Sequence, residues 1–276
     1  MGTLNEAAAA LTTSAGILLA VFTMLCPGAS VTAADSVADK TPATPLRGAR
    51  ITVFAGAASQ PATSEAAKLF TEQTGIKVEC SFGGSGAVLN QIRVEHYGDL
   101  YIPGSDDYMD KAEKEGLVDL GTRRTLCRLQ PVICVPKGNP KRIKGLQDLT
   151  RPGLRLAIGD PKSVCLGSIA KAALEKAGIY AEVSKQIVTF ASDCQQVASL
   201  IRLDEVDAAI GYDVFQRQSP DLIDSVPLEG AAAVTVPAGV VSFSKQKDLA
   251  QRFADYLAGP QGREVFARHG YTVEQP

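Results

Sequence analysis

The chain has 276 residues, of which 45% are hydrophobic and 21% are charged, and its formal net charge is −2 at pH 7. This size and composition fit one large or two modest globular domains and exclude a disordered or fibrous chain. The charge balance provides no basic field for nucleic acid, and two histidines are too few for a typical histidine-based metal centre.

The chain begins with a predicted export signal at residues 1–34. Residues 15–26 form an apolar run that is too short to span a bilayer, where about 20 residues are needed. Val31 and Ala33 then stand at the −3 and −1 positions of a cleavage site, although no Lys or Arg precedes the apolar run. We therefore predict a periplasmic protein whose mature chain starts with a tether at residues 35–48.

Short β-rich runs alternate with amphipathic helices along the rest of the chain. The expected strands, in chain order, are residues 51–55, 78–82, 99–102, 131–136, 154–158, 187–190, 208–211 and 234–243. The expected helices are residues 63–73, 87–94, 107–115, 164–177, 194–203, 247–257 and 261–269. This alternation is typical of an α/β sheet protein.

Small uncharged residues recur where a strand gives way to a helix. They occupy residues 55–59, residues 83–86 and the longer loop 159–167, and Asp193-Cys194 forms a further junction. Helix N-termini carry unpaired N–H groups and a partial positive charge, so converging junctions can hold an anion without Lys or Arg. Neutral donors of this kind suit a fully ionised oxyanion. A single junction indicates only a tight turn, because small residues are common in such turns.

Six segments follow one another along the chain: ITVFAGAAS (51–59), TGIKV (74–78), SFGGSGA (81–87), GDLYI (98–102), LRLAIGDP (154–161) and AKAALEKAG (170–178). In their sequence and order, these segments resemble periplasmic molybdate-binding proteins, and the resemblance covers nearly all of residues 50–272. It implies an α/β, two-lobed type II periplasmic binding fold, in which each lobe is a mixed sheet flanked by helices and two crossover strands join the lobes.

The same resemblance implies where the lobes begin and end. Lobe one would comprise residues 49–127 and 236–276, and lobe two residues 128–235. The crossovers would lie near residues 125–132 and 227–237. The ligand would then bind in the cleft between the lobes.

The resemblance further implies a non-catalytic, monomeric receptor that captures molybdate or tungstate and delivers it to the membrane permease of an ABC importer. No cofactor, no nucleic acid and no metal beyond the oxyanion are expected. The ligand-binding positions that it implies are Ala58, Ser59, Ser85, Leu166, Cys194 and Tyr212. Ser85 and Tyr212 would offer hydroxyls, whereas Leu166 and Cys194 would offer backbone N–H groups. The family's first turn serine falls on Ala58, so Ser59 or a backbone N–H would replace it.

Five cysteines follow the predicted signal and are disulfide candidates after export: Cys80, Cys127, Cys134, Cys165 and Cys194. Cys165 and Cys194 map to the two ligand loops of lobe two. They could form a disulfide, pack as buried thiols, or retune the scaffold for another oxyanion or a thiophilic metal or metalloid. Lipid attachment at Cys26 is less favoured than signal cleavage, because no small residue directly precedes it.

A serine hydrolase is the least favoured alternative. Residues 83–87 (GGSGA) lack only the final glycine of a nucleophile elbow around Ser85. A triad would also need a base, and His96 and His269 both stand at predicted helix ends, where a solvated histidine is the simpler interpretation. Residues 105–107, a serine followed by two aspartates, are predicted to cap a helix.

Overall fold

The structure, a computed structural model, describes residues 48–273. All of the described residues belong to one compact unit. The predicted signal and the predicted tether up to residue 47 lie outside the described residues. No helix within residues 48–273 has the length and apolar character that are needed to cross a bilayer.

The first sheet has five strands in the order β2-β1-β3-β10-β4. Their bounds are β1 (Arg50–Gly56), β2 (Lys77–Gly83), β3 (Leu100–Ile102), β4 (Arg124–Leu129) and β10 (Val234–Val240). β1 pairs in parallel with β2 and β3, whereas β10 runs antiparallel to β3 and β4. We call this sheet and its helices lobe one.

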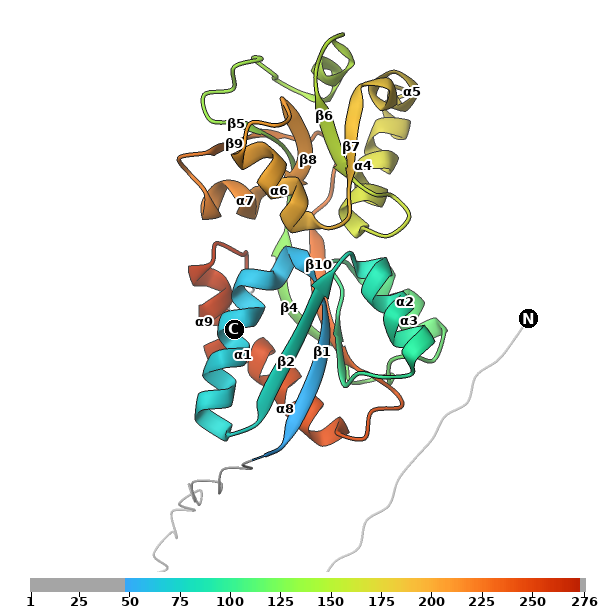
Figure 1. Cartoon of the computed structure of the whole chain (residues 1–276), viewed down its shortest axis with the longest axis vertical. Helices are drawn as coiled ribbons and strands as arrows, with labels where there is room; N and C mark the ends of the chain where they lie inside the picture. Colours follow the sequence, from blue (N-terminus) through green and yellow to red (C-terminus); the bar gives the residue numbers. More distant parts are fainter. Residues whose placement is uncertain (1–47, 274–276) are drawn as a thin grey trace, which may run out of the picture. The chain divides into compact units, whose positions relative to one another are not determined.

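Helices cover both faces of the first sheet (Figure 1). α1 (Gln60–Thr74) follows β1 and α2 (Ser85–Glu95) follows β2, and right-handed crossovers in opposite directions place them on opposite faces. α1 packs with α8 (Lys247–Ala258) and α9 (Pro260–Arg268), and α2 packs with α3 (Asp106–Lys114). Because both faces are covered, the middle of β1 is entirely buried.

The second sheet also has five strands, in the order β7-β6-β8-β5-β9. Their bounds are β5 (Pro131–Pro136), β6 (Leu156–Gly159), β7 (Ile187–Ala191), β8 (Ala208–Tyr212) and β9 (Ile223–Pro227). β6 pairs in parallel with β7 and β8, whereas β5 runs antiparallel to β8 and β9. We call this sheet and its helices lobe two.

Lobe two repeats the winding of lobe one. α4 (Cys165–Lys176) follows β6 and α6 (Cys194–Arg202) follows β7, so the two helices lie on opposite faces of the sheet (Figure 1). The shorter helices α5 (Tyr180–Val183) and α7 (Asp213–Gln218) and the 3₁₀ helices η1 (Ala57–Ser59), η2 (Leu146–Thr150) and η3 (Ser184–Gln186) complete the elements of the described part of the chain.

The chain passes between the two sheets at two places. β4 belongs to the first sheet and β5 to the second, and only Gln130 separates them. The chain returns after β9 and enters the first sheet again as β10. The expected α/β architecture of two mixed sheets flanked by helices is therefore confirmed.

Several helices and strands differ from their expected bounds. α1 begins at Gln60 rather than near Thr63, because Pro61 is accommodated in the first helical turn, where a missing N–H costs nothing. α2 begins two residues earlier than expected, at Ser85. α7 and β9 were not predicted from the sequence, because six and five residues are too few to show a clear period.

Candidate functional site

The candidate site residues follow the carboxyl ends of parallel strands in both lobes. In doubly wound sheets, ligands bind beyond these ends, at the point where successive helices leave to opposite faces. β1 and β6 are the strands at which this happens in the two sheets. The residues that follow or end the six parallel strands are Ala58 and Ser59 after β1, Ser85 after β2, Gly104 and Ser105 after β3, Cys165 after β6, Cys194 after β7, and Tyr212 at the end of β8.

Glycines allow the backbone of lobe one to touch the loops of lobe two. A Cβ atom on Gly84 would lie 2.5 Å from the carbonyl oxygen of Ser163, and one on Gly104 would lie 2.7 Å from Cys165 Sγ. The Gly86 N–H donates a hydrogen bond of 2.9 Å to the same Ser163 oxygen. A side chain at Gly84 or Gly104 would therefore hold the lobes apart.

Ser85 is fixed at the start of α2 by hydrogen bonds from lobe one. Its Oγ accepts a bond of 2.9 Å from the Gly104 N–H, and its carbonyl oxygen accepts one of 2.9 Å from the Tyr101 hydroxyl. The side chain is buried, with 2% of its surface exposed. Because Ser85 Oγ serves as an acceptor for Gly104, its own proton is available to a second acceptor in the site.

Cys165 lies where polar groups from both lobes meet. Its Sγ is 3.7 Å from Tyr212 Oη, and the Cys194 thiol and the Ser85 hydroxyl lie near enough to influence its pKa. The hydrogen bond from Cys194 lowers the pKa of Cys165 although burial opposes this, and Ser85 and Tyr212 lower it further. The same hydrogen bond, together with burial, raises the pKa of Cys194. Neutral donors therefore stabilise one negative charge at this place.

Ser105 joins this group from the end of β3. Its Oγ is fully buried and has no hydrogen-bond partner among residues 48–273, although it lies near enough to Cys165 to help lower the pKa of that thiol. Ser105 was predicted only as a helix cap; it occupies the N-cap position of α3, but its side chain makes no capping bond. The signal that could have identified it is its place in a third small-residue junction, Pro103-Gly104-Ser105, directly after a buried strand.

Ser59 is engaged within its own turn. Its hydroxyl donates to the carbonyl oxygen of Gly56 at 3.2 Å and accepts a bond of 3.1 Å from Thr63 Oγ1. Ala58, which is also buried, accepts a bond from the Tyr271 hydroxyl at its carbonyl oxygen. The structure thus gathers Ser85, Cys165, Cys194 and Tyr212 but connects Ser59 to its own helix. A ligand role for Ala58 or Ser59 stays a prediction.

Two helix N-termini in lobe two offer backbone donors. Leu166 is the second residue of α4 and Cys194 is the first residue of α6. Within the described part of the chain, neither N–H donates to a backbone carbonyl, as is usual for the first turn of a helix. The Asp193 side chain caps α6 by accepting from the Gln196 N–H, which leaves the Cys194 N–H unused by the cap.

The other three described cysteines differ from Cys165. All five are free thiols in this structure. Burial raises the pKa of Cys80 and Cys134 to about 12 and raises that of Cys127 further, so these thiols stay protonated and unreactive. Residues 48–273 contain no group of three or more His, Cys, Asp or Glu side chains that could hold a metal ion.

The two histidines do not assemble a triad with Ser85. His96 caps the opposite end of α2, about 16 Å along the helix axis from Ser85. His269 Nε2 instead lies 2.6 Å from Glu65 Oε2, in a contact between α1 and the end of α9. The described residues therefore provide no hydrogen bond from a histidine to Ser85.

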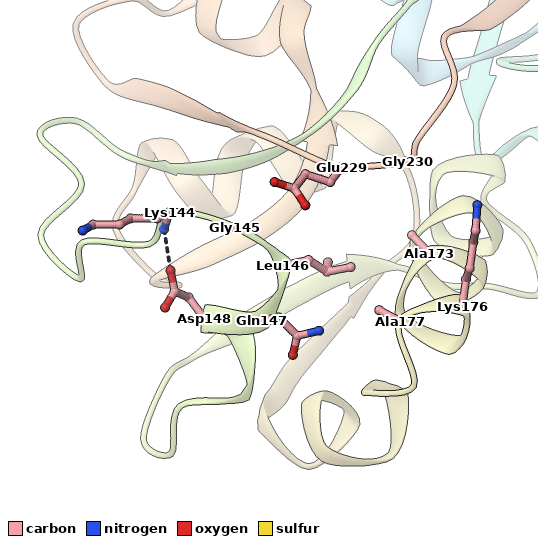
Figure 2. Close-up of a pocket in the computed structure, with 10 residues that line it drawn as sticks. All are labelled: Lys144, Gly145, Leu146, Gln147, Asp148, Ala173, Lys176, Ala177, Glu229 and Gly230. Carbon is pink, nitrogen blue, oxygen red and sulfur yellow. Dashed lines mark hydrogen bonds between the residues drawn. The ribbon is translucent and has the colours of Figure 1, made fainter.

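A separate hollow of about 580 Å³ lies on lobe two (Figure 2). It is lined by residues 144–148 and by Ala173, Lys176, Ala177, Glu229 and Gly230. Two lysines and two acidic residues balance its charge, and the Lys144 N–H is already bonded to Asp148 Oδ2 at 2.6 Å. It shares no residue with the group around Cys165, and its balanced charge does not favour an anion.

Comparison with known proteins agrees with this geometry. A family described as bacterial extracellular solute-binding protein matches residues 51–272. The molybdate-binding protein ModA of Escherichia coli K12 is 31% identical over 232 residues, which cover 82% of this chain and 90% of that protein.

Two solved structures share the fold. The periplasmic molybdate-binding protein of Azotobacter vinelandii is similar with a TM-score of 0.69 and 19% identity, over 82% of this chain and 100% of that one. The sulfate-binding protein SubI of Mycobacterium tuberculosis is similar with a TM-score of 0.71 and 19% identity, over 81% of this chain and 86% of that one. The two-lobed fold inferred from the sequence is thereby confirmed.

Proposed function

This chain belongs to the bacterial extracellular solute-binding protein family, and we propose that it captures a tetrahedral oxyanion, molybdate or tungstate, between its two lobes. The proposal includes an ABC importer as the system that receives the ligand. Its membrane permease would be the partner, and the periplasm would be the compartment in which a monomeric, non-catalytic receptor works.

The observation that carries the proposal is the group of neutral donors around Cys165. The hydroxyl of Tyr212 lies 3.7 Å from the buried Cys165 thiol, and this hydroxyl, the Ser85 hydroxyl and the Cys194 thiol all lower the pKa of Cys165, which means that they stabilise negative charge on its sulfur. Within residues 48–273, no carboxylate is hydrogen-bonded to any of these four side chains. Without a carboxylate to act as a strong acceptor for the proton of a protonated anion, the site favours an oxyanion that is fully ionised near neutral pH.

Access to this position requires movement of the lobes and of one side chain. Cys165 Sγ lies in the middle of the donors, so an anion that binds among them displaces this thiol or contacts it. Opening of the lobes at the two crossovers would expose the donors, and closure would bury the bound anion away from water. The resemblance of the chain to ModA supports molybdate and tungstate as the first ligands to test.

The test is thermal unfolding of the reduced protein with molybdate, tungstate, sulfate or phosphate. A ligand that binds only the folded state raises the unfolding temperature with its concentration. We expect a rise with molybdate and tungstate, and a loss of affinity of roughly tenfold or more in Ser85→Ala, because a hydrogen bond to a charged group is removed. Ser184→Ala, which changes a serine on η3 that bonds only within its own turn, is the matched control.

The proposal fails if neither molybdate nor tungstate raises the unfolding temperature. A rise with sulfate alone would mean that the protein is a receptor for sulfate and not for molybdate or tungstate. Equal affinity of wild type and Ser85→Ala for molybdate would mean that the binding site does not include the group around Cys165.

A further inference from the structure

We propose that Cys165 and Cys194 form a dithiol site that captures trivalent arsenic, offered as arsenite, by condensation with both thiols. The site lies within the cleft of the proposed oxyanion site but does not require that oxyanions bind there. The observation behind it is the placement of two cysteines in one lobe: each is first in the helix that follows one of the neighbouring parallel strands β6 and β7, and each is at least 97% buried.

The positions of the two thiols fit a chelate. Cys165 begins α4 and Cys194 begins α6, and these helices pack on opposite faces of the second sheet and start at its carboxyl edge. Both thiols are free in this structure, and each influences the pKa of the other. Because both belong to lobe two, movement between the lobes does not separate them.

The condensation balances without an oxidant. At neutral pH arsenite is As(OH)₃, a neutral molecule with arsenic in the trivalent state. Two S–H bonds and two As–O bonds break, two As–S bonds form, and two water molecules leave. Arsenic keeps its oxidation state and one hydroxyl, so the product is (Cys–S)₂As–OH. The thiolate is the attacking species, and the hydrogen bonds that lower the pKa of Cys165 make it available there.

The groups around the thiols suit the hydroxyl that arsenic retains. Ser105 Oγ is buried without a partner among the described residues, with 2% of the residue exposed, and it lies near Cys165. Tyr212 Oη is 3.7 Å from Cys165 Sγ. A hydroxyl on arsenic could therefore bond to groups that water cannot reach.

A multidentate metal ion fits the same place less well. The described residues contain no group of three or more His, Cys, Asp or Glu side chains suited to a metal. Structural zinc is usually held by four such ligands. Trivalent arsenic is three-coordinate, and it needs only two protein thiols when it keeps one hydroxyl. The two thiols of this site therefore provide the number of protein ligands that arsenic requires.

The experiment measures arsenic retained by the reduced protein. The protein is incubated with sodium arsenite and desalted, the bound arsenic is quantified by mass spectrometry, and the free thiols are counted after denaturation in acid. We expect one arsenic per chain and the loss of two titratable thiols. Cys165→Ser and Cys194→Ser should each weaken arsenite binding by roughly a hundredfold or more, because a two-point attachment becomes a single one.

Cys80→Ser is the matched control, because it removes a thiol in lobe one that has no contact with Cys165. This variant should retain arsenic like the wild type. The inference is overturned if the wild type retains no arsenic, or if Cys165→Ser and Cys194→Ser retain as much as Cys80→Ser. Thermal unfolding with molybdate distinguishes this inference from the proposed function. If the protein retains arsenic but molybdate does not raise its unfolding temperature, only the oxyanion proposal is rejected. If molybdate raises the unfolding temperature but no arsenic is retained, only the dithiol site is rejected.

Discussion

At the scale of single residues, the absence of a side chain at Gly104 sets the distance between the lobes. Its amide holds Ser85 Oγ, while its α-carbon faces Cys165 of the other lobe. A methyl group there would lie 2.7 Å from Cys165 Sγ and 3.4 Å from Ser85 Oγ. The first distance is too short for packed atoms, so the strain would act across the lobe contact more than within lobe one.

We therefore expect Gly104→Ala to weaken molybdate binding by about tenfold or more while changing the unfolding temperature of the ligand-free protein little. The strain disappears when the lobes part, so it opposes the closed form and not the folded lobes. Titration calorimetry and thermal unfolding measure the two effects. Gly145→Ala is the control, because a Cβ there meets no atom within 4 Å. Equal affinities of the two variants would contradict the interpretation.

Asp207 provides a pH-dependent contribution to stability. It is 6% exposed, and its carboxylate accepts bonds from the Arg155 N–H at 2.8 Å and the Arg155 guanidinium at 3.0 Å. Burial alone would raise the pKa of Asp207, but the bonds from Arg155 hold it below its ordinary value. A carboxyl whose folded pKa is lowered adds stability above its unfolded pKa, about 3.9, and loses that stability as pH falls through the lower folded value.

We expect Asp207→Asn to lower the free energy of unfolding by about 1.5–3 kcal/mol at pH 7, the usual range for hydrogen bonds to a charged group. The difference from wild type should shrink as the pH falls below 4, because the wild-type carboxyl is then protonated. Urea unfolding at a series of pH values measures both effects. Asp221→Asn, an exposed position, should behave like the wild type. A difference that does not depend on pH would show that packing, not charge, is lost.

At the scale of elements, the start of α6 depends on one capping side chain. Asp193 precedes the helix, and its Oδ1 accepts a bond of 2.9 Å from the Gln196 N–H. A carboxylate at this end also suits the positive pole of the helix dipole. Because Cys194 is the first residue of this helix, the cap also fixes the position of one of the two site thiols.

We expect Asp193→Ala to destabilise the protein by about 1 kcal/mol, the typical value of an N-cap, and Asp193→Asn to lose less, because Asn also caps well. Arsenite retention should fall in the alanine variant if fraying of the first turn moves the Cys194 thiol. Denaturant unfolding and bound arsenic measure these effects. The expectation fails if alanine and asparagine variants have the same stability.

The longer elements could be predicted from the sequence, and the contacts between them could not. Buried strands such as Pro131–Pro136 and long amphipathic helices such as Cys165–Lys176 have a clear pattern. The proximity of Cys165 and Cys194 depends on the order of β6 and β7 in the sheet, which local patterns do not specify. Ser105 was missed for the same reason, since only the tertiary fold brings β3 opposite lobe two.

At the scale of the whole molecule, side chains of lobe two hold backbone carbonyls of lobe one. Gln195 Nε2 donates to Ala57 O at 3.1 Å, and Gln218 Nε2 donates to His269 O at 3.1 Å. Arg217 Nε donates to Gly270 O at 2.5 Å. These bonds and the Gly86–Ser163 contact join the lobes around the buried donors, so they belong to the closed form that the proposed function requires.

We expect the double variant Gln195→Ala/Gln218→Ala to need several-fold to tenfold more molybdate for closure. Each lost hydrogen bond contributes about 1 kcal/mol, and these bonds are made only when the lobes meet. In small-angle X-ray scattering, the radius of gyration of the wild type should fall as molybdate is added, and the fall should shift to higher concentration in the variant.

The unfolding temperature of the ligand-free variant should change little, because neither glutamine side chain bonds within its own lobe. Gln147→Ala, which changes an exposed side chain of lobe two, is the control. If the radius of gyration of variant and wild type depends on molybdate concentration in the same way, these bonds do not determine the closed form. The close approach of the lobes at Gly84 and Gly104 must then determine it.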